Sequence, residues 1–204
     1  MKTDPGWIPI PDESPIDDIS GLLVKGIGTR RQLNQVEAEN ITLAAAKYLV
    51  GRLSPADAPF TFDWLFDLHK EMFGNVWGWA GKPRTHDTNL GCPFYDVEAQ
   101  VMNLVADLEY WGKDPSRLID DAALLHYRAV KIHPFANGNG RWSRMLSNIW
   151  LRKHGTRPTV WPEPQIGEVS PIRTAYIDAI KAADANNFGP LIALHKQYTT
   201  TDGE

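Results

Sequence analysis

The sequence predicts one mainly α-helical domain, and three observations support this class. The 204 residues fall within the usual size of a single domain and are enough for a full hydrophobic core. Hydrophobic residues make up 43% and charged residues 23%, both close to the averages of globular proteins. Apolar residues recur at helical spacing along most of the chain from Thr29 onward.

The elements follow in chain order. Residues 1–28 begin with a proline-rich acidic stretch and are expected to form an extended arm, and residues 29–204 are expected to form the single domain. The first helix is expected within residues 34–50, on a stripe formed by Leu33, Val36, Ile41, Ala44, Ala45 and Tyr48. Further helices are predicted at 61–73, 96–112, 117–132, from just after Gly140 to about His154, after the Ser170-Pro171 cap, and from Gly189-Pro190 to near Tyr198.

Residues 82–95 differ from the rest of the chain. They show no helical stripe and are rich in turn-forming and β-branched residues. The segment is therefore predicted to be a short exposed hairpin or loop.

Composition argues against several classes of protein. The net charge of −4 lacks the basic footprint of a nucleic-acid binder, so direct nucleic-acid binding is not expected. No stretch approaches 18 apolar residues and the N-terminus lacks the apolar region of a signal peptide, so neither a membrane span nor secretion is expected. Cys92 is the only cysteine, which fits a reducing cytoplasm, and without a nearby base it is read as incidental.

The segment from His133 to Arg144 carries the most chemistry. Gly138 and Gly140 let peptide N–H groups converge on an anion, and the helix that follows adds its positive N-terminal end. Arg141 and Arg144 share one helix face and suit the oxygens of a di- or triphosphate. His133 is suited to accept a proton near neutral pH. Each feature alone is more often structural, but their joint order and spacing favour a phosphate-transfer site.

This segment resembles the signature of the Fic family, His-Pro-Phe-x-(Asp/Glu)-Gly-Asn-Gly-Arg-x-x-Arg, and departs from it only at Asn137. Trp79-Ala80-Gly81 followed by Arg84 resembles the segment that leads into the family's flap. The details are similar to the small Fic proteins called mobile mystery protein B. The resemblance implies a helical core of about six to eight helices with a small β-hairpin flap, and transfer of AMP from ATP to a protein hydroxyl.

The resemblance also implies residue roles. His133 would be the base acting on a serine, threonine or tyrosine hydroxyl of a target protein. Arg141 would hold the inner phosphates and Arg144 the γ-phosphate. The implied phosphate-binding residues are Gly138, Asn139, Gly140, Arg141 and Arg144. Without the resemblance, the Asn139 side chain could equally bond within the loop and hold its shape. The implied flap, which pairs with the target backbone as an added strand, consists of Thr85, His86, Asp87, Thr88 and Asn89.

Asn137 stands where the family usually has an acidic residue that helps to hold Mg²⁺. An amide oxygen can still bind a hard cation but lacks the attraction of a negative charge. The metal would then be held mainly by the phosphates of ATP, which leads us to expect a working but weaker site.

Many Fic proteins carry an inhibitory helix whose glutamate occupies the second arginine of the signature. Glu37 and Glu39 are the candidates here, and they lie about 200° apart on a helix. Glu37 shares the apolar stripe, so it is expected to face the site and pair with Arg144, with Glu39 as the alternative. The simpler interpretation is that Glu37 complements the helix dipole.

Other functions stay open at this point. The same fold could transfer phosphate or phosphocholine, or remove AMP. A different class is a nucleotide-binding regulatory module or half of a toxin–antitoxin-like pair, with a helix-turn-helix partner encoded nearby. Asn137 favours that class and the retained His133 argues against it. A histidine metal site lacks zinc-type spacing and a hydrolase lacks its elbow motif, and a homodimer is left open.

Overall fold

A computed structural model describes residues 21–51, 53–163, 166 and 170–199 of the chain. This part of the chain is mainly helical, as predicted, and its isolated β-bridge joins Leu22 to Trp77. Its α-helices are α1 (Arg30–Leu49), α2 (Phe62–Phe73), α3 (Val97–Leu108), α4 (Leu118–Ile132), α5 (Asn139–Lys153), α7 (Pro171–Asp184) and α8 (Gly189–Thr199). Two short 3₁₀-helices, η1 (Phe94–Asp96) and η2 (Pro115–Arg117), precede α3 and α4.

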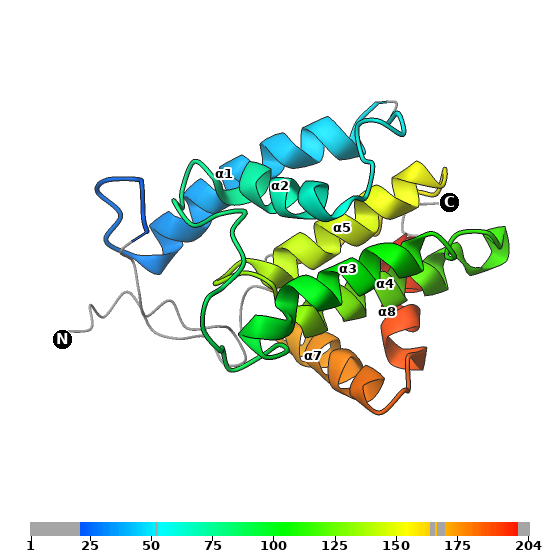
Figure 1. The fold of residues 1–204 in the computed structure, drawn as a ribbon. Helices are drawn as coiled ribbons and strands as arrows, with labels where there is room; N and C mark the ends of the chain where they lie inside the picture. Colours follow the sequence, from blue (N-terminus) through cyan, green and yellow to red (C-terminus); the bar gives the residue numbers. More distant parts are fainter. Residues whose placement is uncertain (1–20, 52, 164–165, 167–169, 200–204) are drawn as a thin grey trace.

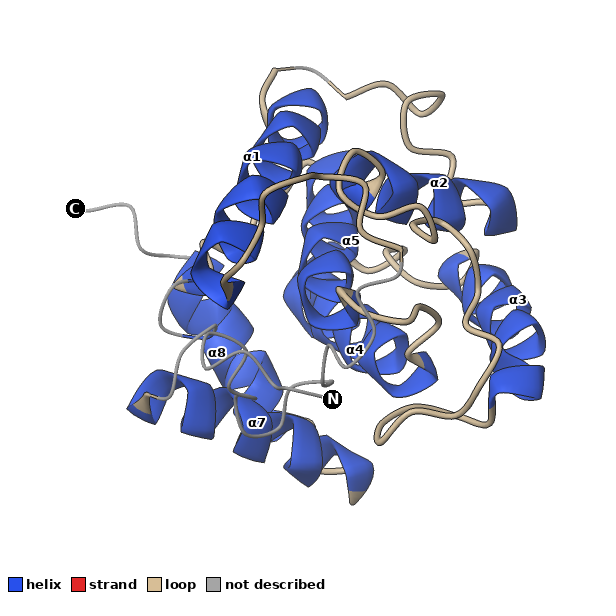
Figure 2. Ribbon diagram, turned by 90° about the vertical axis from the view of Figure 1, so that its left-hand side faces the viewer, coloured by secondary structure: helices blue, strands red, loops and turns tan. Residues whose placement is uncertain are grey.

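Helix α5 lies at the centre of the molecule (Figure 1). Eleven of its 15 residues are buried, so α5 is enclosed around most of its circumference, although several of the buried side chains are polar. Helix α4 packs beside it, α1 and α2 cover it on one side, and α7 and α8 pack together on the other side of α4 (Figure 2). The loop from α4 to α5 lies where these layers meet, and this position brings α1 and α7 close to the start of α5.

The helix starts follow local chemistry. The Thr29 hydroxyl accepts the amide of Gln32, whose side chain bonds back to the Thr29 amide, so α1 begins with a capping box. Ser170 caps α7 and Pro171 occupies its first turn, as the sequence predicted. The helix predicted at 96–112 ends earlier, at Leu108, because the chain turns there and Gly112 adopts a left-handed conformation with φ +78°.

Of the hairpin or loop predicted for residues 82–95, the structure forms a loop, and the β-hairpin flap that the family resemblance implied is not formed. Residues 82–93 make an irregular loop without strand structure. The reason lies in its hydrogen bonds, since the carbonyl groups of His86 and Cys92 accept from the guanidinium of Arg84 instead of from backbone amides across the loop. We call residues 82–93 the flap loop.

The N-terminal arm is described only in its last part. Leu23 donates its amide to Val76 O at 2.8 Å and Gly78 donates to Gly21 O at 2.8 Å, so the chain before α1 is attached to the segment after α2. Residues 1–20 of the predicted arm lie outside the described residues. Within the described part, none of the helices combines the length and the apolar character that crossing a bilayer requires.

Candidate active site

The loop from α4 to α5 is built around a glycine and an aromatic anchor. Gly138 caps α5 in a left-handed conformation with φ +80°, and a Cβ there would lie 2.7 Å from the ring of Phe73. Only glycine fits this position, because both the backbone angle and the space exclude a side chain. Phe135 is fully buried and stacks on His69 with 3.6 Å between ring centroids. The first turn of α5 is thereby held rigidly in place.

Two asparagines complete the loop. Asn139 accepts the amide of Phe135 at 2.9 Å and donates to its carbonyl at 2.8 Å, so its side chain locks the loop and does not point at a ligand. Asn137 folds back and accepts the amide of Gly138 at 2.5 Å. The cap residue Gly138 provides no side-chain hydrogen bond to the first turn of α5. Peptide N–H groups of that turn are therefore left for an anion.

His133 ends α4 and is almost fully buried, at 6% exposure. Its backbone is left-handed, with φ 51°, and its Nδ1 lies 3.3 Å from Val130 O. Since a carbonyl can only accept, Nδ1 carries the proton, and the lone pair of the neutral ring is on Nε2. Burial, aided by the charge of Arg84, lowers the His133 pKa to about 4. The ring is thus neutral at physiological pH and has the protonation state of a base.

Glu37 reaches the site from α1. It is 1% exposed, whereas Glu39 is exposed on the same helix. Its Oε2 accepts from Arg141 Nη1 at 2.8 Å and its Oε1 accepts from Trp77 Nε1 at 2.6 Å. The expected pair with Arg144 is therefore not formed. Trp77 holds the carboxylate above the first turn of α5, level with Arg141, while Arg144 lies one turn further along.

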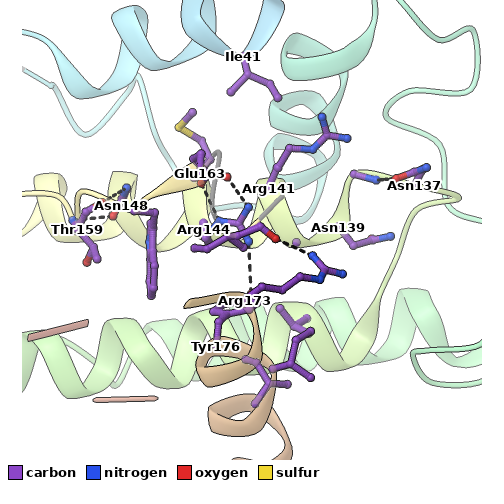
Figure 3. Close-up of a pocket in the computed structure, with 18 of the residues that line it drawn as sticks. Ile41, Asn137, Asn139, Arg141, Arg144, Asn148, Thr159, Glu163, Arg173 and Tyr176 are labelled. Carbon is purple, nitrogen blue, oxygen red and sulfur yellow. Dashed lines mark hydrogen bonds and ion pairs between the residues drawn. The ribbon is translucent and has the colours of Figure 1, made fainter. Parts of the chain in front are cut away.

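Arg144 has a different partner, which the sequence did not reveal. Its guanidinium donates to both carboxylate oxygens of Glu163, at 2.7 and 2.5 Å, and lies over the ring of Tyr176 (Figure 3). The arginine side chain is 6% exposed and that of Glu163 is 48% exposed. Each of the two arginines is thus engaged by a carboxylate from a separate segment of the chain.

His133, the start of α5, both arginines and Glu163 line one cavity of about 790 Å³. Its lining includes His133, residues 137–141, Arg144 and Glu163, together with apolar residues of α1 and α7. In Figure 3, Arg141 points toward Ile41 of α1, while Arg144 lies between Glu163 and Tyr176. The volume is that of a site for a medium-sized ligand, and the loop supplies its polar end.

The part of the chain that contains the loop from α4 to α5 indicates the family. Residues 59–151 match the sequence model of the Fic/DOC family. These residues form a Fic/DOC domain. Glu37 and Glu163 both lie outside the matched residues of this domain, so the two carboxylates that engage its arginines come from flanking parts of the chain.

Relatives of the chain are found among curated proteins and solved structures. Protein adenylyltransferase fic-1 from Caenorhabditis briggsae is 29% identical over 180 residues, which cover 85% of this chain and 33% of that protein. The chain thus spans about a third of the length of this relative. Residues 134–508 of Fic-1 from C. elegans superpose with a TM-score of 0.63 at 25% identity, over 89% of this chain and 52% of that one.

A second solved structure supports the fold alone. BepC from Bartonella tribocorum, a VirB-translocated effector with bound AMPPNP, gives a TM-score of 0.65 at 18% identity. The match covers 87% of this chain and 91% of that chain. The helical arrangement of the Fic domain is therefore shared over nearly the whole of both chains.

His69 supports the loop from α4 to α5 through two hydrogen bonds. Its Nδ1 accepts the amide of Gly81 at 3.0 Å, so the proton is on Nε2, which donates to Asn137 O at 3.0 Å. Complete burial lowers its pKa to about 3, and the ring stays neutral. The spacing of the histidines gave no sign of this role, because the partners of His69 are brought together only by the fold.

A second buried polar chain begins at Arg144. The guanidinium can only donate, so the Tyr176 hydroxyl accepts from it at 3.5 Å and donates its own hydrogen bond to His126 Nε2 at 2.9 Å. His126 Nδ1 then donates to His195 Nε2 at 3.0 Å, and His195 Nδ1 donates to the Thr159 hydroxyl at 3.2 Å. One direction of donation satisfies every group, and it requires that both histidines be neutral.

The remaining predicted residues were also located. Thr85, His86, Asp87 and Asn89 are exposed on the flap loop and Thr88 is half-buried. Over the described residues, no group of three His, Cys, Asp or Glu side chains is placed to hold a metal ion. Asn137 contributes a single neutral oxygen, which already accepts from Gly138, so the protein side chains present do not form a Mg²⁺ site by themselves.

The buried histidines predict acid sensitivity. The pKa values of His69 and His195 are lowered to about 3 by burial and that of His126 is also lowered, whereas an unfolded histidine titrates near about 6.5. Below that pH the unfolded chain binds more protons than the folded one, so the free energy of unfolding falls as pH drops from about 6.5 toward 4. Each histidine contributes about 1.4 kcal/mol per pH unit.

Chemical denaturation at a series of pH values measures this slope. His195→Gln is expected to remove the share of one histidine, and His86→Gln, at an exposed position, is expected to leave the slope unchanged. An unaltered slope in His195→Gln would contradict the assignment of this histidine as neutral in the folded state.

Proposed function

We propose that this domain transfers AMP from ATP to a serine, threonine or tyrosine hydroxyl of a target protein. The observation that carries the proposal is the neutral, buried imidazole of His133 beside a glycine-lined helix start and two arginines, all lining one cavity. The relative from C. briggsae, a protein adenylyltransferase, supports the same reaction. The bound AMPPNP in the BepC structure supports a nucleotide in this fold.

The proposed reaction is an in-line substitution at the α-phosphorus. The target hydroxyl oxygen attacks, a new bond forms between that oxygen and the α-phosphorus, and the bond to the bridging oxygen breaks. Pyrophosphate leaves, and the hydroxyl proton moves to His133 Nε2. The first-turn amides of α5 and the guanidinium of Arg141 lie where they can stabilise the negative charge of the phosphates.

The cavity also offers a contact to the remainder of a nucleotide. Trp161 lines it and is 8% exposed, and its indole N–H lacks a partner among the described residues. Buried donors are rarely left unpaired, so a ligand acceptor is a natural partner for this N–H. Mg²⁺ would come with the triphosphate, with Asn137 as one neutral ligand, and no step of the proposal depends on it.

We further propose that the resting site is autoinhibited. Glu37 occupies Arg141, and Glu163 occupies Arg144, the arginine expected to hold the γ-phosphate. A triphosphate needs both guanidinium groups, so it must displace two carboxylates before it binds in the reactive position. The inhibitory role given to Glu37 thus acts through Arg141, and Glu163 is a second occupant.

Labelled ATP tests the proposed donor chemistry. Label at the α-phosphorus is expected to appear on a target protein or on the chain itself, and label at the γ-phosphorus is expected to remain in solution. Both labels should be absent from protein incubated with the His133→Ala variant. Incorporation of the γ-label would instead identify phosphate transfer and overturn the proposal of AMP transfer.

A further inference from the structure

Arg84 is a buried cation in the flap loop that the reaction described above does not use. Its side chain has no solvent exposure. Its Nε donates to His133 O at 2.7 Å and its Nη2 contacts Ile132 O at 3.5 Å. Its Nη1 donates to His86 O at 3.0 Å, and its Nη2 also donates to Cys92 O. One guanidinium therefore joins both arms of the flap loop to the last turn of α4.

The local electrostatics explain why an arginine suits this position. The last carbonyls of a helix lack intrahelical partners and form its negative end. Arg84 satisfies two of them with fixed, planar donors, and its backbone amide bonds to Pro134 O at 2.9 Å. The only carboxylate recorded near its guanidinium among the described residues is Asp87, at 3.6 Å. A lysine would keep the charge but could not reach these four carbonyls together.

Gly91 brings the flap loop into direct contact with the base. It has φ +106°, and a Cβ there would lie 2.6 Å from His133 Cβ and 2.9 Å from Arg84 Nη2. The backbone of the flap loop thus touches the residue that carries the imidazole. The two contacts, one through Arg84 and one through Gly91, fix the same pair of segments independently.

We propose that Arg84 is a positioning residue that aligns the flap loop, where the target backbone would dock, with the imidazole of His133. This inference rests on the proposed function, because it assigns the flap loop to the target and His133 to the target hydroxyl. Arg84 does not line the nucleotide cavity, so its effect should appear in transfer to the target and not in nucleotide binding.

Arg84→Lys keeps the positive charge and removes the planar set of donors, so it tests whether the guanidinium geometry matters. The expected result is a fall of roughly 10- to 100-fold in kcat/KM for transfer to a target or in the rate of self-labelling, because a small misplacement of reacting groups has effects of this size. The Kd for ATP, measured by calorimetry, should stay within about twofold. Amide hydrogen exchange should quicken in residues 85–91 and not in α5.

Two further variants keep the test decisive. Gly91→Ala should reproduce the loss of transfer with Arg84 intact, because it pushes the flap loop away from His133. Arg128→Gln, which removes a contact between α4 and Asp107 of α3, is the matched control and should leave transfer unchanged. Full transfer activity in Arg84→Lys, or flap exchange equal to wild type, would overturn the proposal. If the wild-type protein transfers no AMP at all, the proposed function fails, while the exchange data still decide whether Arg84 holds the flap loop.

Discussion

Replacing His133 is expected to lower the rate of AMP transfer by roughly 10²- to 10⁴-fold, the usual contribution of a positioned general base. Alanine removes the ring but is strained at φ 51°. Asparagine is the better variant, because it tolerates the left-handed conformation and can still donate to Val130 O. Neither variant changes the first-turn amides or the arginines of α5, so ATP should bind with nearly its original Kd.

Single-turnover labelling with ATP carrying the α-label, beside calorimetric titration of ATP, measures the two quantities separately. His154→Ala is the matched control, because that ring packs against Trp150 near the end of α5 and does not line the cavity. A His133→Asn variant that labels its target at the wild-type rate would show that another group takes the proton.

The helices were predictable because their signals are local. Apolar spacing, a Thr or Ser before the first turn and a Pro inside it depend on residues a few positions apart. Helices α1, α2, α4, α5 and α8 begin and end close to the expected places, and α7 begins at the predicted cap. The errors occurred where a distant contact decides. The helix expected to reach residue 112 stops at Leu108, where the chain turns toward α4 and Asp121 accepts the amide of Gly112 at 3.0 Å.

The flap loop shows the same limit. Turn-forming and β-branched residues indicated a hairpin or a loop, and a hairpin would require that its two arms bond to each other. Here the Arg84 guanidinium donates to carbonyl groups of both arms. It also donates to carbonyl groups at the end of α4, about fifty residues away in the sequence. Local composition correctly located an irregular segment and could not reveal the side chain that shapes it.

The site was predicted to the extent that it is contiguous. The residues from His133 to Arg144 lie within twelve positions, so their arrangement depends on local sequence. The choice of Glu37 over Glu39 followed from the helical period and agrees with the burial of Glu37. The partner of Glu37 could not be derived, because both arginines share one face of α5. Glu163 gave no signal, since it lies in a proline-flanked segment without a periodic pattern and meets Arg144 only through the packing of α7.

Releasing both arginines is expected to produce the second large effect. Glu37→Gly frees Arg141 and Glu163→Gln weakens the hold on Arg144, and each should raise the rate of AMP transfer roughly tenfold or more, since hydrogen bonds to charged groups contribute about 1.5–3 kcal/mol. The carboxylates act on different guanidinium groups, so the double variant should approach the product of the two effects, on the order of 10²- to 10³-fold. Labelling with α-labelled ATP at subsaturating concentration measures each rate.

Glu39→Gly is the control for the first variant, because it introduces the same helix-weakening glycine on α1 at an exposed position. It should leave the rate unchanged, which separates release of Arg141 from loosening of the helix.

The two carboxylates can also be distinguished by comparing the affinities for ATP and ADP. Glu163→Gln should raise the affinity for ATP more than that for ADP, because Arg144 is assigned to the γ-phosphate, whereas Glu37→Gly should raise both. Equal gains for ATP and ADP in Glu163→Gln would contradict the assignment of Arg144, and unchanged labelling in Glu37→Gly would show that the contact between α1 and Arg141 only stabilises the fold.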